Sequence, residues 1–190
     1  IEIAAPVDGA GYSVGQAVHA DYSCSDEAGG SGVASCVGTV PDGEQIDTSR
    51  AGAHTFVVNA TDAAGNTSSR TVTYRVGYSF SGFFWPVQDP PKLNRWKAGL
   101  PVPIRFSLDG FRGSRPEAEG YPRSVRCGGG GAELAPATPW RRSAFDYDRR
   151  RDQYWMLWKT ERKWAGSCRE FVLMLDDGSV HTAKFQFSKR

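Results

Sequence analysis

The sequence predicts an all-β protein made of two consecutive antiparallel β-sandwich domains, an Ig-like sandwich over residues 1–76 and a second Ig-like or jelly-roll-like sandwich over residues 77–190. Apolar residues recur at every second position in several short runs, which is the period of a half-buried strand. Turns rich in Gly, Asp and Asn separate these runs at short spacing, and no stretch shows the 3.6-residue period of a helix.

A change in composition divides the chain in two. Residues 1–76 hold three basic and nine acidic side chains, a net charge of −6, whereas residues 77–190 hold twenty basic and twelve acidic side chains, a net charge of +8. All six tryptophans follow residue 84. We therefore expect a domain boundary near Val76 and Gly77, with the stretch "GYSFSGFF" at 77–84 as a short, stiff junction.

Three runs of the first domain alternate as strands do, namely "AVHADYSC" at 17–24, "HTFVVNATD" at 54–62 and "RTVTYRV" at 70–76. The second run places His54, Phe56, Val58 and Ala60 on one face, and the third does the same with Val72, Tyr74 and Val76. A sandwich of about 76 residues has a small core of marginal stability, so we expect a covalent link to contribute.

Two cysteines enclose a soft loop, because "CSDEAGGSGVASC" sets Cys24 and Cys36 at the ends of a stretch of Ser, Gly, Ala and acidic residues. A bond between them would stabilise the domain by about 3 kcal/mol, since it removes loop entropy from the unfolded chain. The chain has four cysteines, no CxxC spacing and three histidines, a set that favours two disulfides over a zinc site. We therefore expect an extracellular or cell-surface protein.

The sequence starts without Met and has no apolar run near 18 residues. From this we expect a mature or excised segment with no membrane span.

The stretch "AAPVDGAGYSVGQAVHADYSCSDEAGGSGVASCVGTVPDG" and the later "AGAHTFVVNATDAAGNTSSRTVTYRV" resemble the bacterial Ig-like and HYR-type modules of secreted and surface proteins. The resemblance covers residues 1–76 and implies a spacer or adhesion-stalk unit. It also implies a calcium ligand at Asp62, in the Asp-x-x-Gly-Asn turn, with Asp26 as a helper. The alternative is that this turn forms without any metal, and we expect no other cofactor.

In the second domain, "LPVPIRFSL" at 100–108 directs four apolar side chains inward and Pro103, Arg105 and Ser107 outward. A proline within such a run indicates an edge strand. The segment "REFVLMLDDGSVHTAKFQF" predicts a hairpin that turns at Asp177-Gly178. The segment "AFDYDRRRDQYWMLWKT" predicts a second hairpin, with "DRRRD" as its turn.

Residues 77–190 resemble the PxKF domain found near the C-termini of secreted bacterial proteins, through "FSGFFWPVQDPPKLNRWKAGLPVPIRFSLDG", "WAGSCR" and "DDGSVHTAKFQF". The motif here reads Pro103-Ile104-Arg105-Phe106, with Arg in place of Lys. The resemblance implies a bond between Cys127 and Cys168, and it implies no active site. Local pairing within each domain is the simpler arrangement, and any other pairing would connect the two domains.

No catalytic motif occurs: HExxH, GxSxG, a P-loop and a dinucleotide-binding glycine turn are all missing from the sequence. The three histidines are scattered; we expect His54 to be packed and His181 to lie at the surface. The carboxylate pairs Asp146/Asp148 and Asp176/Asp177 occur in turns. We therefore expect no catalysis in this segment, the alternative being an acid–base pair assembled from distant strands.

Aromatic and basic side chains of the second domain indicate a binding role. Trp155 and Trp158 are three apart in one strand and point to opposite faces, so one can fill the core while the other meets a partner. An exposed aromatic ring can stack on a sugar, and nearby arginines attract an anionic polymer. The candidate ligand-binding residues are Trp155, Trp158, Tyr154, Arg149 and Arg151, with Arg141, Arg142 and Arg150 close in sequence. Under the competing interpretation the tryptophans are core and the arginines lie in solvated turns.

Two functions follow as hypotheses. The preferred one is a non-catalytic, C-terminal accessory region that spaces, stabilises or attaches an upstream domain of the same exported bacterial polypeptide. The second is a module that binds polysaccharide or cell wall through exposed Trp or Tyr and Arg of residues 77–190. No recognised nucleic-acid motif supports a nucleic-acid partner.

Overall fold

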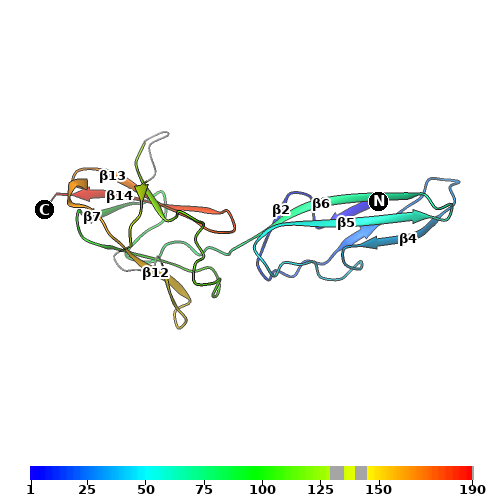
Figure 1. The fold of residues 1–190 in the computed structure, drawn as a ribbon, viewed down its shortest axis with the longest axis horizontal. Helices are drawn as coiled ribbons and strands as arrows, with labels where there is room; N and C mark the ends of the chain where they lie inside the picture. Colours follow the sequence, from blue (N-terminus) through cyan, green and yellow to red (C-terminus); the bar gives the residue numbers. More distant parts are fainter. Residues whose placement is uncertain (129–134, 140–144, 190) are drawn as a thin grey trace. The chain divides into compact units, whose positions relative to one another are not determined.

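A computed structural model describes residues 1–128, 135–139 and 145–189, and divides the chain into two compact units, Ile1–Gly77 and Tyr78–Arg190 (Figure 1). The described residues form β-strands and one short 3₁₀ helix, η1 (Arg162–Trp164), and contain no α-helix. The all-β class predicted from the sequence is confirmed. Among the described residues there is no helix long and apolar enough to cross a membrane.

The first unit contains two sheets (Figure 1). One sheet pairs β1 (Glu2–Ala5) with β3 (Asp21–Ser23). The other has the order β2-β6-β5-β4, and its strands are β2 (Ala10–Ser13), β4 (Val33–Gly38), β5 (Gly52–Asp62) and β6 (Thr67–Gly77). The antiparallel pair β5–β6 forms a long hairpin, and β2 pairs with β6 in parallel.

The core of the first unit follows the predicted alternation. Its buried side chains are Ala20, Tyr22, Ile46, Phe56, Val58, Val72, Tyr74 and Val76. His54 is packed as expected: its ring stacks on Tyr74 at 5.1 Å between centroids, and its Nε2 lies 2.8 Å from the carbonyl of Arg50. The strand predicted over 17–24 is shorter in the structure, because β3 covers only Asp21–Ser23.

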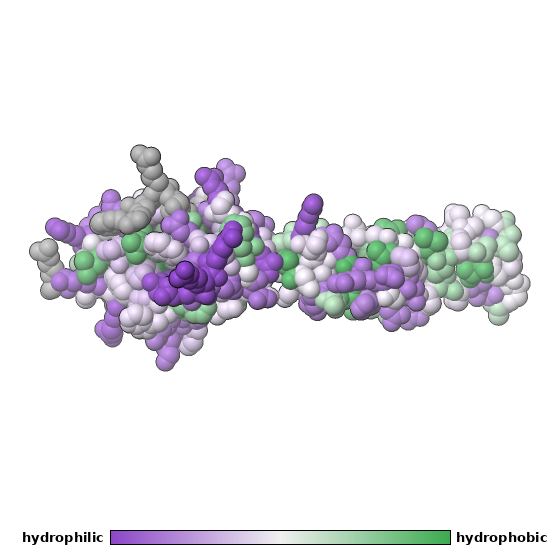
Figure 2. Space-filling model, turned by 90° about the horizontal axis from the view of Figure 1, so that it is seen from below, coloured by the Kyte–Doolittle hydropathy of each residue, from purple (hydrophilic) through white to green (hydrophobic). Residues whose placement is uncertain are grey.

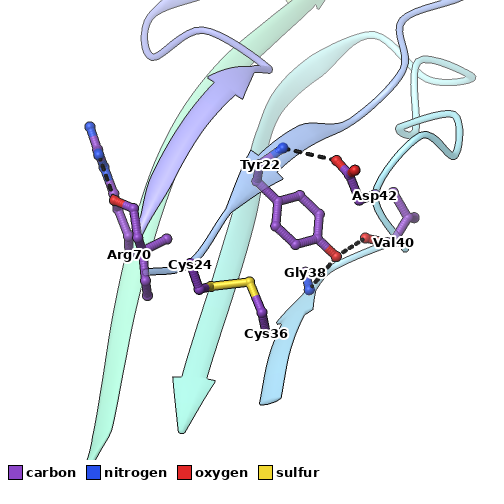
Figure 3. The surroundings of a disulfide bond; sticks show 8 residues. Tyr22, Cys24, Cys36, Gly38, Val40, Asp42 and Arg70 are labelled. Carbon is purple, nitrogen blue, oxygen red and sulfur yellow. Dashed lines mark hydrogen bonds between the residues drawn. A yellow bond between two sulfur atoms is a disulfide. The ribbon is translucent and has the colours of Figure 1, made fainter. Parts of the chain in front are cut away.

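A disulfide joins Cys24, just after β3, to Cys36 in β4, and so links the small sheet to the edge of the large one (Figure 3). Beside it, the Tyr22 hydroxyl accepts a hydrogen bond from the amide of Gly38 at 2.9 Å and donates one to the carbonyl of Val40 at 3.2 Å (Figure 3). The bond and the tyrosine together tie the two sheets at this end.

The second unit also has two sheets, which Figure 1 shows on opposite sides of the unit. The five-stranded sheet has the order β10-β9-β13-β14-β7, with β7 (Leu93–Lys97), β9 (Arg123–Arg126), β10 (Ala135–Pro136), β13 (Cys168–Met174) and β14 (Val180–Ser188). The three-stranded sheet has the order β11-β12-β8, with β8 (Val102–Phe106), β11 (Asp146–Asp148) and β12 (Gln153–Trp158). Both predicted hairpins form, as β11–β12 and β13–β14, and β14 pairs with β7 in parallel.

Aromatic side chains from both sheets fill the core of this unit. The Trp158 indole is fully buried, and its centroid lies 5.3 Å from those of Phe171 and Phe185 and 6.0 Å from that of Phe187. A second disulfide joins Cys127, directly after β9, to Cys168 at the start of β13. Each cysteine pair therefore lies within one unit.

One residue of the β8 run departs from the alternation predicted for it. Ser107 was expected to point to solvent but is buried, because β8 ends at Phe106 and the Ser107 hydroxyl donates a 2.7 Å hydrogen bond to Asp152. The same carboxylate accepts the amide of Gly110 and the hydroxyl of Tyr147. Asp152 therefore holds the loop after β8 against the β11–β12 turn.

Candidate functional site

The outer face of the three-stranded sheet carries the residues that the sequence singled out. Along β12, Tyr154, Met156 and Trp158 point into the core, and Gln153, Trp155 and Leu157 are partly exposed on the other face. Alternation along the strand fixes this division.

Strand pairing places Trp155 in a row of side chains across this outer face. Trp155 pairs with Arg105 of β8 on one side and with Asp146 of β11 on the other. Cross-strand partners have Cβ atoms about 5 Å apart, so these side chains are immediate neighbours. Two residues before Trp155, and therefore on the same face, Gln153 pairs with Asp148.

Residues 81–84 extend this sheet beyond β8. The amide of Phe84 donates to the carbonyl of Arg105 at 2.9 Å, and the amide of Ser81 donates to the carbonyl of Ser107 at 3.1 Å. Phe83 forms a bridge with Phe106 and is buried against the core. Alternation then places the partly exposed Phe84 on the outer face, beside Arg105.

A depression of about 270 Å³ opens on this face and is lined by Arg105, Asp148, Arg151, Gln153 and Trp155. The guanidinium of Arg151 forms a 3.0 Å ion pair with Asp148, whose Oδ1 accepts the amides of Arg150 and Arg151. Desolvation acts to raise the pKa of Asp148, but these hydrogen bonds and the Arg151 charge outweigh it and lower the pKa. The carboxylate is therefore ionised and held in place at the rim of the depression.

Arg105 differs from Arg151 in having no such partner among the residues that the structure describes. Its side chain is exposed beside Trp155, and none of the residues in the described part of the chain forms an ion pair or hydrogen bond with its guanidinium. No residue in the described part of the chain competes with a ligand for its N–H donors.

The structure brings two of the five candidate binding residues into the depression, Trp155 and Arg151. Arg149 and Arg150 are exposed in the adjoining turn and do not line it. Arg141 and Arg142 lie outside the described residues. In the space-filling view, strongly hydrophilic side chains lie among apolar patches on the visible face of the second unit (Figure 2).

The prediction that Tyr154 and Trp158 bind a ligand is wrong, because both are core residues, with 1% and 0% of their surface exposed. The Tyr154 hydroxyl accepts the amide of Arg112 and donates to the carbonyl of Gly113, so it anchors the 109–113 loop. Neither side chain can reach a ligand at the surface.

The sequence alone did not assign Arg105, Gln153 and Asp148 to the site, nor Phe84 beside it. Trp85 directly follows Phe84 and is 80% exposed. Arg105 was expected to point outward, but only the pairing of β8 with β12 reveals that it adjoins Trp155.

The residues predicted to bind calcium, Asp26 and Asp62, line one shallow depression of the first unit. Asp62 accepts the side-chain amide of Asn66 at 2.7 Å and its backbone amide at 2.8 Å, and these bonds lower the pKa of Asp62. Asp26 accepts the amides of Glu27 and Gly32. The described residues contain no group of three or more His, Cys, Asp or Glu side chains that could hold a metal ion, and calcium binding at Asp62 and Asp26 stays a prediction.

Three side chains of the final hairpin resemble parts of a nucleophilic triad but have the wrong order of hydrogen bonds. The Ser179 hydroxyl donates to Asp177 at 2.6 Å, and His181 Nε2 lies 3.0 Å from the same hydroxyl. In a triad the serine proton goes to the histidine, and the aspartate binds the far side of the ring. His181 is also half-buried against Phe80, contrary to the surface position expected for it, and burial lowers its pKa.

Comparison of the sequence with protein-family profiles and with curated proteins gives no match. Among solved structures, the chain has distant similarity to the surface glycan-binding protein SGBP-B of the Bacteroides ovatus mixed-linkage glucan utilization locus, in complex with a mixed-linkage heptasaccharide. The identity is 10%, the TM-score is 0.28, and the similarity covers 98% of this chain and 47% of that one. The chain thus spans about half the length of that protein, and values this low say nothing about what this chain binds.

Proposed function

We propose that this chain is a non-catalytic accessory region of an exported protein, and that its second unit binds a polysaccharide through the outer face of β11–β12–β8. The observation that carries the proposal is the partly exposed indole of Trp155, set among Arg105, Gln153 and Asp148 around one depression. An aromatic platform with polar groups beside it suits the two kinds of surface of a sugar ring.

The chemistry of a pyranose matches this arrangement. Its apolar C–H face can cover the indole of Trp155, while Gln153 offers both a donor and an acceptor to the ring hydroxyls. The ion pair between Arg151 and Asp148 holds a further acceptor at the rim. Because these groups lie on or next to paired strands, little backbone conformational entropy is lost when a ligand binds.

The exported location is supported by the two disulfides, which indicate an oxidising, extracytoplasmic environment. The accessory role is supported by the resemblance of residues 1–76 to Ig-like and HYR-type modules and of residues 77–190 to PxKF domains. Its partners would be an upstream domain of the same polypeptide and an extracellular polysaccharide or the cell wall. The first unit then acts as a spacer.

Affinity electrophoresis and pull-down on a panel of soluble polysaccharides, insoluble glycans and cell walls test the proposal. We expect retention on at least one polymer and its loss in Trp155→Ala, by about thirtyfold in Kd if the stacked ring contributes about 2 kcal/mol. Leu93→Ala is the matched control, because it truncates an exposed apolar side chain on β7, in the other sheet, and should bind like the wild type.

Two results would contradict the proposal. If no polymer retains the chain, the glycan-binding role is contradicted and only the spacer role is left. If Trp155→Ala is retained as well as the wild type, the glycan does not bind at this face. Release of new reducing ends from a retained polymer would contradict the non-catalytic role.

A further inference from the structure

We infer that the polysaccharide is acidic, and that Arg105 binds a carboxylate on the sugar ring that stacks on Trp155. This inference rests on the proposed function, since it concerns the ligand of the same face. Three observations carry it: the position of Arg105, the absence of a partner for its guanidinium among the described residues, and the charge around the depression.

Arg105 lies between two aromatic residues on one row of the sheet. Trp155 of β12 pairs with it on one side, and Phe84 adjoins it on the other. Neighbouring strands are about 5 Å apart, so the backbones of Trp155 and Phe84 are separated by about 10 Å with the arginine between them. A ring stacked on Trp155 therefore directs one of its edges toward Arg105.

The guanidinium of Arg105 has no partner among the described residues, whereas those of Arg112 and Arg151 do. Arg151 is paired with Asp148, and Arg112 donates to the carbonyls of Leu108 and Asp109. Arg105 has no hydrogen-bond or ion-pair partner among the residues with a described position. A neutral sugar stacked on Trp155 would displace water from the Arg105 guanidinium without giving it an anionic partner. A carboxylate on the sugar ring accepts two parallel N–H donors from the same guanidinium.

The charged groups around the depression favour an acidic ligand at Arg105. Arg105 places positive charge on the β8 side of the Trp155 indole. Asp148 is neutralised by Arg151, and Arg149 and Arg150 add positive charge at the adjoining turn. The second unit as a whole therefore attracts an anionic polymer, and Arg105 is the point at which its carboxylate docks.

The experiment compares acidic polymers with the same polymers after reduction of their carboxyl groups. Polygalacturonate, alginate and hyaluronan, each beside its carboxyl-reduced form, are tested by affinity electrophoresis with the wild type, Arg105→Gln, Arg105→Lys and Arg150→Gln. Dextran sulfate serves as an anionic polymer without carboxylates, and xylan as a neutral one.

We expect the wild type to bind at least one carboxylated polymer at least tenfold more tightly than its reduced form, and more tightly than dextran sulfate or xylan. Arg105→Gln should lose this tenfold difference, and Arg105→Lys should keep part of it. Arg150→Gln removes the same charge from the neighbouring turn and should change the affinity less than threefold, because Arg150 does not line the depression.

The inference is overturned if the reduced polymer binds as tightly as the acidic one, or if Arg105→Gln keeps the preference. Stronger binding of dextran sulfate, independent of Arg105, would also overturn it by indicating attraction to charge alone. In each case, binding that still depends on Trp155 leaves the proposed function standing, whereas failure of the wild type to bind any polymer removes both.

Discussion

Removal of the Cys24–Cys36 disulfide should destabilise the first unit by about 3 kcal/mol and leave the second unit unchanged. The cysteines are 12 positions apart, and the loop-entropy model gives this value for a loop of that size. Cys127 and Cys168 are 41 positions apart, for which the same model gives about 4 kcal/mol. A unit the size of Ile1–Gly77 has a total stability of about 4–12 kcal/mol, so the expected loss is a large share.

The distribution of aromatic residues supplies the assay. All six tryptophans lie in the second unit, so tryptophan fluorescence reports the unfolding of that unit alone, whereas far-UV circular dichroism reports both. In urea, a loss of about 3 kcal/mol at a slope of about 1 kcal/mol/M moves the midpoint of the first unit by about 3 M. Cys24→Ser/Cys36→Ser should therefore shift one component of the circular dichroism curve and leave the fluorescence curve in place.

The matched control is Cys127→Ser/Cys168→Ser, for which the fluorescence curve should shift instead. The reasoning is refuted if Cys24→Ser/Cys36→Ser moves the fluorescence midpoint as far as the circular dichroism component. That result would mean that the two units unfold as one.

Three further changes should give distinct results. Gly38→Ala should destabilise the first unit by about 1–3 kcal/mol, because an added Cβ would lie 2.6 Å from the Tyr22 ring and 2.8 Å from a backbone oxygen. Gly11→Ala is the control and should not destabilise the unit, because an added Cβ there meets open space. In urea unfolding followed by circular dichroism, Trp158→Ala should cost about 3–5 kcal/mol and Trp155→Ala far less, and equal losses would contradict the assigned faces. Hydrogen bonds from Tyr147 and Ser107 lower the pKa of Asp152 below its usual 3.8, so its stabilisation is present at neutral pH and is lost as the pH falls below about 4. In Asp152→Asn, the urea midpoint should therefore change less between pH 7 and pH 3 than in the wild type. An equal change in both proteins would contradict this role of Asp152.

The strands and hairpins were predictable because their signals are local. The alternation in β5, β6 and β8 and the Asp177-Gly178 turn each involve neighbouring residues, and the structure reproduces them. The parallel pairs β2–β6 and β14–β7 join segments far apart in sequence, and no local pattern indicates them.

The choice between Trp155 and Trp158 could not be made from β12 alone. "YWMLW" is apolar at both odd and even positions, so alternation separates the two tryptophans without showing which one is buried. Pairing decides it, because Trp158 lies opposite the buried Val102 and Trp155 lies opposite the exposed Arg105.

The other neighbours of the site also depend on strand pairing, which the local sequence does not show. Phe84 adjoins Arg105 only because residues 81–84 pair with the end of β8. Ser107 is buried because of Asp152, which is 45 positions away in the sequence.

The most direct test of the glycan-binding face is an NMR titration of the intact chain with oligosaccharides from the polymer that it retains. The indole N–H signal of Trp155 and the guanidinium signal of Arg105 should shift and saturate together, while the buried indole of Trp158 stays in place. Saturable shifts confined to other residues, with Trp155 unmoved, would contradict the account.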